Sequence, residues 1–394
     1  MTAPRRARLT ATDPVSGELV SRLLDVAVRG LPTMYRPETD EFAFTRAAAS
    51  TDRDGTITEL RGVSIRYAAI VALGAQWLDN ATQRQVLSGR NAADFTAMLI
   101  GRLPGVTNLG DAALICWAAA QGRHPLLPQA LARLRALDEN PGPRYVVEAA
   151  WVVAALAAGR SQADVEDILK RFRDTLLTSR HRGSPLFPHA TGTGLLPWYR
   201  THVACFADQV YPIQALARLH HSGDDAAALA AAEECAGRIC ELQGEGGQWW
   251  WHHDARTGAL VEGYPVYSVH QHAMAPMALL DLAEAGGSDR LPEIVRGLEW
   301  MTGPVELGDD GPSMILDDAG LTWRKVYRGD PRKLVRAAHG LTTRAVPGAR
   351  VRPLERIFRP AAVDRECRPY EFGWLLFTWL GGLGLPSDTP GSAG

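Results

Sequence analysis

The feature that most constrains the fold of this chain is an alternation of two kinds of helical segment. Some segments are apolar on nearly every face, such as RYAAIVALGAQWL and YVVEAAWVVAALAA. Others carry one apolar stripe beside charged residues, such as QADVEDILKRFRDTLL. A helix that is apolar all round belongs inside a protein, and a helix with a single apolar stripe belongs at its surface. The alternation therefore predicts an inner and an outer ring of helices.

Apolar spacing near 3.6 residues defines the helices of these two rings. They are predicted at residues 15–30, 61–78, 81–102, 109–121, 126–137, 143–158, 161–179, 203–220, 224–242, 269–285, 289–302 and 370–383. These segments pair into helical hairpins, so the sequence predicts an all-α fold, an (α/α)6 toroid of six hairpins. No linker rich in Pro, Gly or charge divides the chain, and residues 1–394 are expected to form a single domain. Residues 1–14 and 385–394 are expected to be disordered.

One segment, residues 303–368, interrupts the alternation. It is too polar and too rich in Pro for a buried helix, and too long for a plain connection. We interpret it as a flap or lid inserted before the last inner helix. Its stretch SMILDDAGLTWRKVY predicts a short hairpin with strands on either side of Asp317–Gly320. Between Arg324 and Arg368 there are thirteen Lys or Arg against four Asp or Glu. Such a basic flap would suit a diphosphate or a carboxylate, with a solvated surface as the alternative.

Charge and cysteine content exclude several classes of protein. The net charge of −2 provides no field that would attract nucleic acid, so no nucleic-acid partner is predicted. The five cysteines are scattered without a CxxC spacing, which indicates neither a disulfide framework nor a zinc cluster and favours the reducing cytoplasm. No stretch approaches the roughly 18 apolar residues of a membrane span. The predicted partner is a small molecule, apolar or anionic, and the oligomeric state is left open.

Polar residues at the starts of the inner helices are the candidate catalytic groups, because those helix ends should point into the cavity. Asp208, Glu371, His270 and Tyr267 are the four we select. A helix N-terminus keeps a carboxylate ionised, so a general acid would need burial to raise its pKa. The alternative for Asp208 is a role as an N-terminal cap. For His270 and the nearby His272 the alternative is a role as hydrogen-bonded fillers between helices.

Aromatic and basic residues concentrate in the second half of the chain, where they could line the cavity. Their ring faces could stabilise a carbocation or stack on a sugar, with packing inside the protein as the alternative. The predicted substrate-binding residues are Trp249, Trp251, Tyr264, His272, Trp323, Arg324, Arg328, Arg368, Tyr370 and Trp374. His270 and His272 are two residues apart and would diverge on a helix, so they are not expected to bind one metal ion. No metal site and no cofactor are predicted, with Mg²⁺ left as an option.

The run ELQGEGGQWWW, from Glu241 to Trp251, has Gln243, Gly247 and Trp249 at the spacing of a Gln...Gly-x-Trp repeat. In this motif the chain resembles the toroids of the terpenoid cyclase and protein prenyltransferase superfamily. The resemblance implies that the Gln and the Trp close an outer helix and tie it to the next hairpin. It implies the fold more strongly than a reaction, because the chain lacks the DxDD motif of cyclases that begin by protonation.

The leading hypothesis is an enzyme similar to a terpenoid cyclase, of the kind used in secondary metabolism. It would cyclise a linear isoprenoid, or its prenyl diphosphate, by protonation in an aromatic-lined cavity. The alternative is a carbohydrate-active lyase or C5-epimerase for a uronate-containing sugar, in which Tyr267 and His270 exchange the C5 proton and Arg residues neutralise the carboxylate. A toroid that only binds a lipid or a protein is the third reading. A closed apolar pocket favours the isoprenoid, an open polar groove the sugar, and a filled barrel the scaffold.

Overall fold

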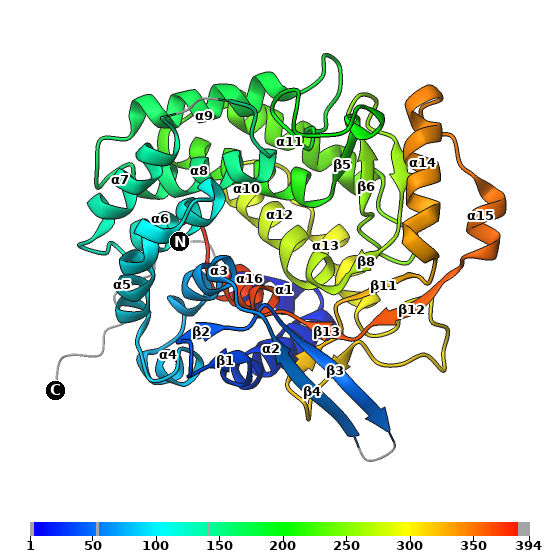
Figure 1. Cartoon of the computed structure of the whole chain (residues 1–394), viewed down its shortest axis with the longest axis horizontal. Coiled ribbons are helices and arrows are strands. Elements are labelled where there is room, and N and C mark those ends of the chain that lie inside the picture. Colours follow the sequence, from blue (N-terminus) through cyan, green and yellow to red (C-terminus); the bar gives the residue numbers. More distant parts are fainter. Residues whose placement is uncertain (1–3, 53–54, 140–141, 385–394) are drawn as a thin grey trace.

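The computed structural model describes residues 4–52, 55–139 and 142–384. Its centre is a ring of inner helices, each of which packs on the next, and the last of which returns to the first (Figure 1). In ring order they are α3 (Ile65–Ala75), α6 (Leu109–Gln121), α8 (Val146–Gly159), α10 (Ala207–Gly223), α12 (Ala275–Glu284) and α16 (Pro369–Leu380). A π-helical turn, His270–Met274, leads into α12. These helices are buried on most faces, as their nearly continuous apolar sequences predict.

A second ring of helices surrounds the first, and each of its members packs on an inner helix. The outer helices are α2 (Pro14–Gly30), α5 (Ala92–Arg102), α7 (Leu127–Leu137), α9 (Glu166–Ser179), α11 (Ala226–Glu241) and α13 (Leu291–Trp300). α2 contacts both α16 and α13, which closes the outer ring. Six outer and six inner helices in alternation confirm the predicted (α/α)6 toroid within the described part of the chain.

Two predictions, one of a single helix and one of disorder, differ from the structure at places where side chains make specific contacts. The expected helix 81–102 is two helices, α4 (Asn80–Val86) and α5, because Ser88 and Gly89 have φ of 54° and 87° and the Asn91 side chain caps α5. Residues expected to be disordered form α1 (Arg5–Thr12), which buried ion pairs of Arg5 hold to the barrel. The N- and C-terminal residues 1–3 and 385–394 lie outside the described residues.

Short strands form five small antiparallel sheets among the described residues. The pairs are β1 (Tyr35–Arg36) with β2 (Glu41–Phe42), and β9 (Ile315–Leu316) with β10 (Leu321–Thr322). The three-stranded sheets are β13 (Glu366–Cys367), β3 (Thr45–Asp52) and β4 (Gly55–Arg61); β12 (Pro360–Asp364), β11 (Lys325–Arg328) and β8 (Val266–Tyr267); and β5 (Val203–Cys205), β6 (His252–Asp254) and β7 (Leu260–Glu262). The pair β9–β10 confirms the hairpin expected around Asp317–Gly320.

The basic segment 303–368 is tied to the barrel through strands on both of its sides. β11 pairs with β8 just before the π-helical turn, and β13 pairs with β3. Between them lie two helices that the sequence did not predict, α14 (Leu334–Ala345) and α15 (Arg352–Ile357), at the side of the barrel (Figure 1). The buried face of α14 includes His339 and Thr343, so its inward side is polar and gives little apolar periodicity.

The end of the barrel at which the inner helices terminate is closed by buried, paired charges. Asp281 of α12 accepts from Arg218 of α10 at 2.6 Å and also pairs with Arg5 of α1. Arg5 in turn donates to Glu284 at 2.6 Å. Asp281 is fully buried, and Arg5 and Arg218 are 3% and 8% exposed. Within the described residues, each charge of this group has an opposite partner.

The motif that suggested a family has a structural role. Gln243, two residues after the end of α11, donates to the carbonyl oxygen of Glu293 in α13 at 2.9 Å, and its own oxygen accepts from Arg296 at 2.9 Å. Gly247 has a φ of +84°, and a Cβ there would lie 1.9 Å from the carbonyl oxygen of Arg296. Trp249 is 1% exposed and packs beside Phe206. The motif thus joins one outer helix to the next.

Candidate functional site

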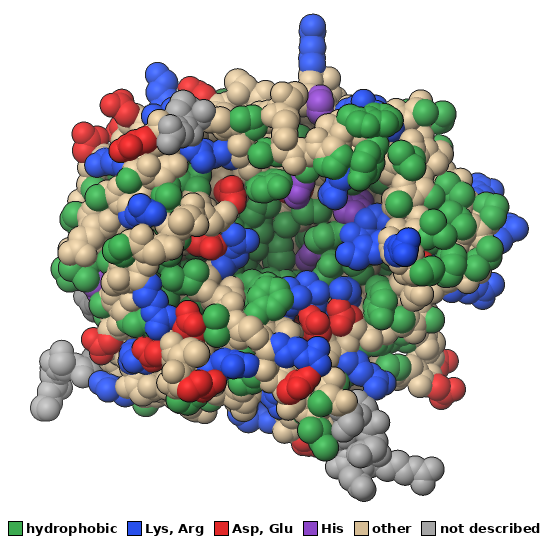
Figure 2. Space-filling view, viewed as in Figure 1, with side chains coloured by type: hydrophobic (Ala, Val, Ile, Leu, Met, Phe, Trp, Pro, Cys, Tyr) green, Lys and Arg blue, Asp and Glu red, His purple; other side chains and the backbone are tan. Residues whose placement is uncertain are grey.

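The barrel is hollowed at the end where the inner helices begin. Figure 2 shows this hollow at the centre of the molecule, with hydrophobic side chains inside it and basic, acidic and His side chains around its rim. Its floor is a contact across the barrel, because the indole Nε1 of Trp374 donates to the Tyr211 hydroxyl at 2.9 Å. The Trp117 ring packs beside that of Trp374, with the ring centroids 5.8 Å apart. The cavity is therefore closed below by aromatic rings and open above.

Two acids stand one helical turn above this floor. Asp208 precedes Tyr211 by three residues on α10, and Glu371 precedes Trp374 by three residues on α16. Residues three apart lie on the same side of a helix. Since Tyr211 and Trp374 meet, the two carboxyl groups flank the space above them from different walls of the barrel. Both are fully buried.

Glu371 has the environment of a proton donor. Among the described residues neither of its oxygens has a hydrogen-bond partner, and Oε1 lies 3.9 Å from Nε of Arg324. Burial raises the pKa of Glu371 to about 8, against the opposing influence of the Arg324 and Arg368 charges. A carboxyl group with such a pKa is largely protonated at neutral pH and can deliver its proton to a bound molecule.

Two arginines lie near Glu371 and could bind an anion. The Arg324 guanidinium lies 5.0 Å from the centre of the Tyr267 ring and is shared loosely between Asp364, at 3.6 Å, and Glu366, at 3.8 Å. Arg368 donates to the Tyr67 hydroxyl at 3.0 Å and lies over the ring of Phe44. The ring of Tyr370 packs 4.6 Å from that of Tyr67. Guanidinium groups on aromatic faces suit a planar carboxylate.

Asp208 forms a pair with His189, a residue that was not selected from the sequence. Oδ2 of Asp208 lies 2.8 Å from Nδ1 of His189 and also accepts from the backbone N–H of Cys205 at 2.6 Å. Burial lowers the pKa of His189, but the charge and hydrogen bond of Asp208 outweigh it, so the net shift is upward. A carboxylate that orients an imidazole in this way favours a general base. The alternative in which Asp208 is only a helix cap does not include this pair.

A third polar group begins at α3 and continues across the starts of α6 and α8. Arg66 donates to Asp111 at 2.6 Å and to Asn108 at 3.1 Å, and Asn108 donates to Glu148 at 2.7 Å. The guanidinium of Arg66 lies 5.3 Å from the Trp151 ring, on the inner surface of the barrel. These residues extend the polar rim to the first half of the chain, from which the sequence analysis selected no site residue.

His270 and its neighbours form an aromatic wall. The His270 ring stacks on Trp251, with centroids 5.5 Å apart and planes at 17°, and lies 4.9 Å from Tyr267. Burial lowers the pKa of His270 well below its ordinary value, and burial raises that of Tyr267. Both side chains are therefore neutral at pH 7. They can form a stacking surface more readily than they can exchange protons.

The structure places five of the predicted substrate-binding residues outside this hollow. Trp249, Trp323 and His272 are buried within the wall, and neither ring nitrogen of His272 has a partner among the described residues. Tyr264 and Arg328 lie in a separate pocket outside the barrel, where Tyr264 donates to Glu306 at 2.8 Å and Arg328 pairs with Glu262 at 3.3 Å. Sequence neighbours of Tyr267 and His270 thus diverge, because β8 and the π-helical turn that follows it aim their side chains in different directions.

Two groups of side chains in the described residues have the composition of a cation site. One is His189, Cys205 and Asp208, and the other is Glu262, His339 and Glu355, each with its ligand atoms within 4.8 Å of one another. Hydrogen bonds already link the members, at 2.8 Å for His189–Asp208 and 2.6 Å for His339–Glu262. That the protein uses no metal ion and no cofactor therefore remains a prediction.

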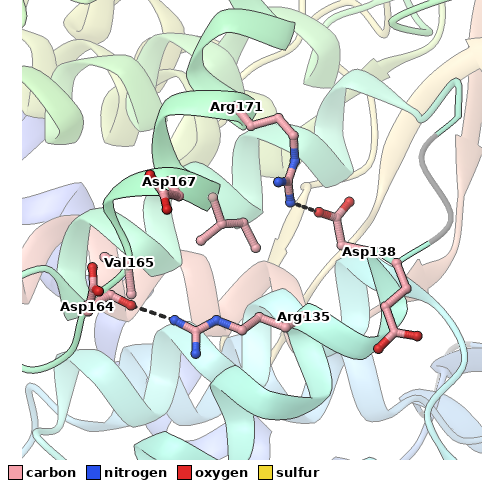
Figure 3. Close-up of a pocket in the computed structure, with 8 residues that line it drawn as sticks. Arg135, Asp138, Asp164, Val165, Asp167 and Arg171 are labelled. Atoms are coloured by element: carbon pink, nitrogen blue, oxygen red, sulfur yellow. Dashed lines mark hydrogen bonds and ion pairs between the residues drawn. The ribbon is translucent and has the colours of Figure 1, made fainter.

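A surface pocket on the outside of the barrel differs from the hollow in the pairing of its charged side chains. Between α7 and α9, Arg171 points toward Asp138, and Arg135 donates to the carbonyl oxygen of Asp164 at 2.5 Å (Figure 3). The pocket has a volume of about 540 Å³, and its buried acid, Asp138, pairs with arginines. Paired charges on an outer face indicate a link between helices, so we place the site in the hollow.

None of the described helices combines the length and the apolar character needed to cross a membrane.

No protein-family model matches the chain, and no curated protein matches it in sequence. Solved structures do resemble it in fold. An unsaturated glucuronyl hydrolase specific for heparin superposes with a TM-score of 0.57 at 14% identity, covering 92% of this chain and 95% of that one. The unsaturated glucuronyl hydrolase of Bacillus sp. GL1 superposes with a TM-score of 0.58 at 13% identity, covering 93% of this chain and 96% of that one.

A third such enzyme, from Streptococcus agalactiae, gives a TM-score of 0.59 at 12% identity, covering 93% of this chain and 90% of that one. These likenesses establish the α/α-toroid fold, and they correct the family resemblance suggested by Gln243, Gly247 and Trp249, which is wrong. The motif is a way to join outer helices, and it does not specify chemistry. The predicted cyclisation of an isoprenoid is wrong with it, since the chain resembles toroids of glucuronyl hydrolases and its hollow is open and rimmed by charge.

Proposed function

We propose that this protein is an enzyme that acts on an acidic saccharide, a sugar chain with a uronate bound in the hollow. This is the carbohydrate-active alternative named from the sequence, now with hydrolysis as the reaction. The observation that carries the proposal is Glu371, a fully buried carboxyl group without a hydrogen-bond partner among the described residues, with Arg324 3.9 Å away. An acid held protonated beside a cation suits a substrate that brings its own negative charge.

The proposed roles follow from the positions of the side chains. Arg324 and Arg368 would bind the uronate carboxylate, and Glu371 would protonate the glycosidic oxygen as its bond to the anomeric carbon breaks. The His189–Asp208 pair, on a different wall of the barrel, would accept a proton from the water that attacks the anomeric carbon. Trp251 and Tyr267 would stack on the sugar ring. The structures with similar folds support this reading, because they belong to unsaturated glucuronyl hydrolases, of which the Bacillus enzyme is responsible for the degradation of glycosaminoglycan.

A carboxyl donor is favoured over the proton exchange between Tyr267 and His270 that an epimerase would need. The pKa of Tyr267 is raised and that of His270 is lowered, so the phenol does not ionise and the imidazole does not protonate at pH 7.

We also propose a cytoplasmic location, because the five cysteines are free, and no disulfide links them.

The test is an activity assay with a matched panel of oligosaccharides. The purified protein would be incubated with saccharides that end in a saturated uronate, an unsaturated uronate or the corresponding neutral sugar, and products would be identified by mass spectrometry. We expect cleavage of a uronate-terminated saccharide and at least tenfold slower cleavage of its neutral counterpart, because about 1.4 kcal/mol of lost carboxylate binding gives a factor of ten. Equal rates for acidic and neutral saccharides, or no turnover of any uronate, would reject the proposal.

A further inference from the structure

A second basic pocket lies beside the hollow, outside the barrel wall. It has a volume of about 360 Å³ and lies between the β7–β8 connection, β11 and the start of α14. Five cations line it: Lys325, Arg328, Arg332, Lys333 and Arg336. Three acids, Glu262, Asp330 and Asp364, line it as well, so its charge depends on which cations are paired.

Each of the three acids is already engaged. Asp364 pairs with Lys325 at 2.5 Å, and Glu262 pairs with Arg328 at 3.3 Å and with His339 at 2.6 Å. Asp330 accepts from the backbone N–H of Val335 at 2.9 Å, at the start of α14. The carboxylates of this pocket are therefore used to hold the segment in place and to neutralise two of its cations.

The other three cations have no carboxylate partner among the described residues. Arg332 and Lys333 are exposed, and Arg336 is half-buried, with an Nε that is buried and donates to no group described. Burial lowers the pKa of Arg336, as expected for a guanidinium without a counter-ion. Arg332 and Lys333 also have φ of 49° and 57°, a left-handed conformation that non-glycine residues rarely adopt and that is enriched at ligand clamps.

This pocket adjoins the hollow through Lys325. Its ammonium lies 5.4 Å from the ring centre of Tyr267, in the hollow, and 5.7 Å from that of Tyr327, in the pocket. Burial raises the pKa of the Tyr267 phenol, and the positive charge of Arg336, like that of Arg324, partly offsets this rise. A chain that leaves the hollow past Tyr267 would therefore meet Lys325 first and the unpaired cations next.

We infer that this pocket binds a second anionic group, a carboxylate or a sulfate ester, on a sugar next to the one held in the hollow. The inference rests on the proposed function for its saccharide and adds that the preferred saccharide is polyanionic. Arg332, Lys333 and Arg336 would bind the oxyanion, and the faces of Tyr264 and Tyr327 would contact the sugar that carries it. No bond is made or broken in the pocket, so its contribution is to affinity and to the choice of substrate.

The test measures affinity, so that it does not depend on turnover. Three uronate-terminated tetrasaccharides would be titrated calorimetrically into the protein, with a neutral, a carboxylated or a sulfated sugar next to the terminal uronate. The double variant Arg332→Gln/Arg336→Gln would be compared with Arg352→Gln/Arg356→Gln, which removes the same charge from exposed positions of α15 outside the pocket.

We expect the wild type to bind one or both anionic saccharides about tenfold more tightly than the neutral one, in line with one charge-assisted contact. The pocket variant should lose this preference and the α15 variant should keep it. The inference is overturned if the wild type has no preference, or if the two variants behave alike. Whichever anionic saccharide is preferred identifies the group. Tight binding with no turnover would instead reject the proposed function and leave the anion pocket supported.

Discussion

The two ends of the barrel differ in whether their buried carboxyl groups have bonded partners. At the closed end, Asp281 lies between Arg5 and Arg218, and all three are held by short ion pairs. At the open end, Glu371 is as deeply buried, yet its oxygens bond to no described residue. Removing one partner of a buried ion pair lowers the free energy of unfolding, and so does burying a polar group that has no hydrogen-bond partner. The closed end therefore contributes stability, while the open end keeps a polar group available to a ligand at some cost in stability.

The largest expected effect is on activity at the open end. Glu371→Gln keeps the size of the side chain but removes the transferable proton, so turnover of the uronate saccharide should fall by about 10²- to 10⁴-fold. Binding should be retained, since Arg324 and Arg368 remain. Steady-state kinetics and calorimetric titration would be measured beside Glu299→Gln, an exposed control. Unchanged turnover in Glu371→Gln would remove Glu371 from the mechanism.

The next largest effect is on stability at the closed end. Asp281→Asn leaves Arg5 and Arg218 buried without their shared carboxylate, and the free energy of unfolding should fall by about 3–5 kcal/mol. Chemical denaturation would measure it, with Asp289→Asn as control. Asp289 pairs with Arg8 at the surface, where both side chains are substantially exposed, so its loss should change stability by at most about 1 kcal/mol. Equal effects of the two substitutions would mean that the closed end is not held by its buried charges.

The two ends should also respond to pH with opposite signs. The folded pKa of Glu371 is raised to about 8 from 4.5, so its stabilising contribution is full below pH 4.5 and is lost as pH rises toward 8 and above. The arginines lower the pKa of Asp281 despite its burial, so its contribution is full above 3.8 and is lost as pH falls below that value. Denaturation curves from pH 3 to about 9 should show that Glu371→Gln is less sensitive than wild type between 4.5 and 8. Parallel curves over that interval would contradict the raised pKa.

The smallest expected effect separates the motif from the chemistry. Gln243→Ala removes the hydrogen bonds that link α11 to α13, and the free energy of unfolding should fall by about 1–2 kcal/mol, while kcat and KM stay as in wild type. Chemical denaturation and kinetics on one preparation would measure both. A loss of activity larger than the loss of folded protein would show that this part of the wall supports the hollow.

Much of the barrel could be predicted because its signal is local. The helices 109–121 and 126–137 were expected from apolar spacing, and α6 and α7 match them within a residue at either end. The break before α5 depends on the turn at Ser88 and Gly89, which the continuous apolar spacing conceals. α14 was missed because its buried face contains His339 and Thr343, whose partners come from elsewhere in the chain.

For the candidate site, the sequence by itself determined where chemistry should be sought. Polar residues at the starts of apolar inner helices must face the end of the barrel, and this reasoning selected Asp208 and Glu371. Only the tertiary structure decided what surrounds each of them: His189 reaches Asp208 from a connection, and Arg324 reaches Glu371 from the basic segment. The physical reason is that a helix position follows from the local period, whereas the pKa of a buried group depends on charges and solvent that distant segments bring or exclude.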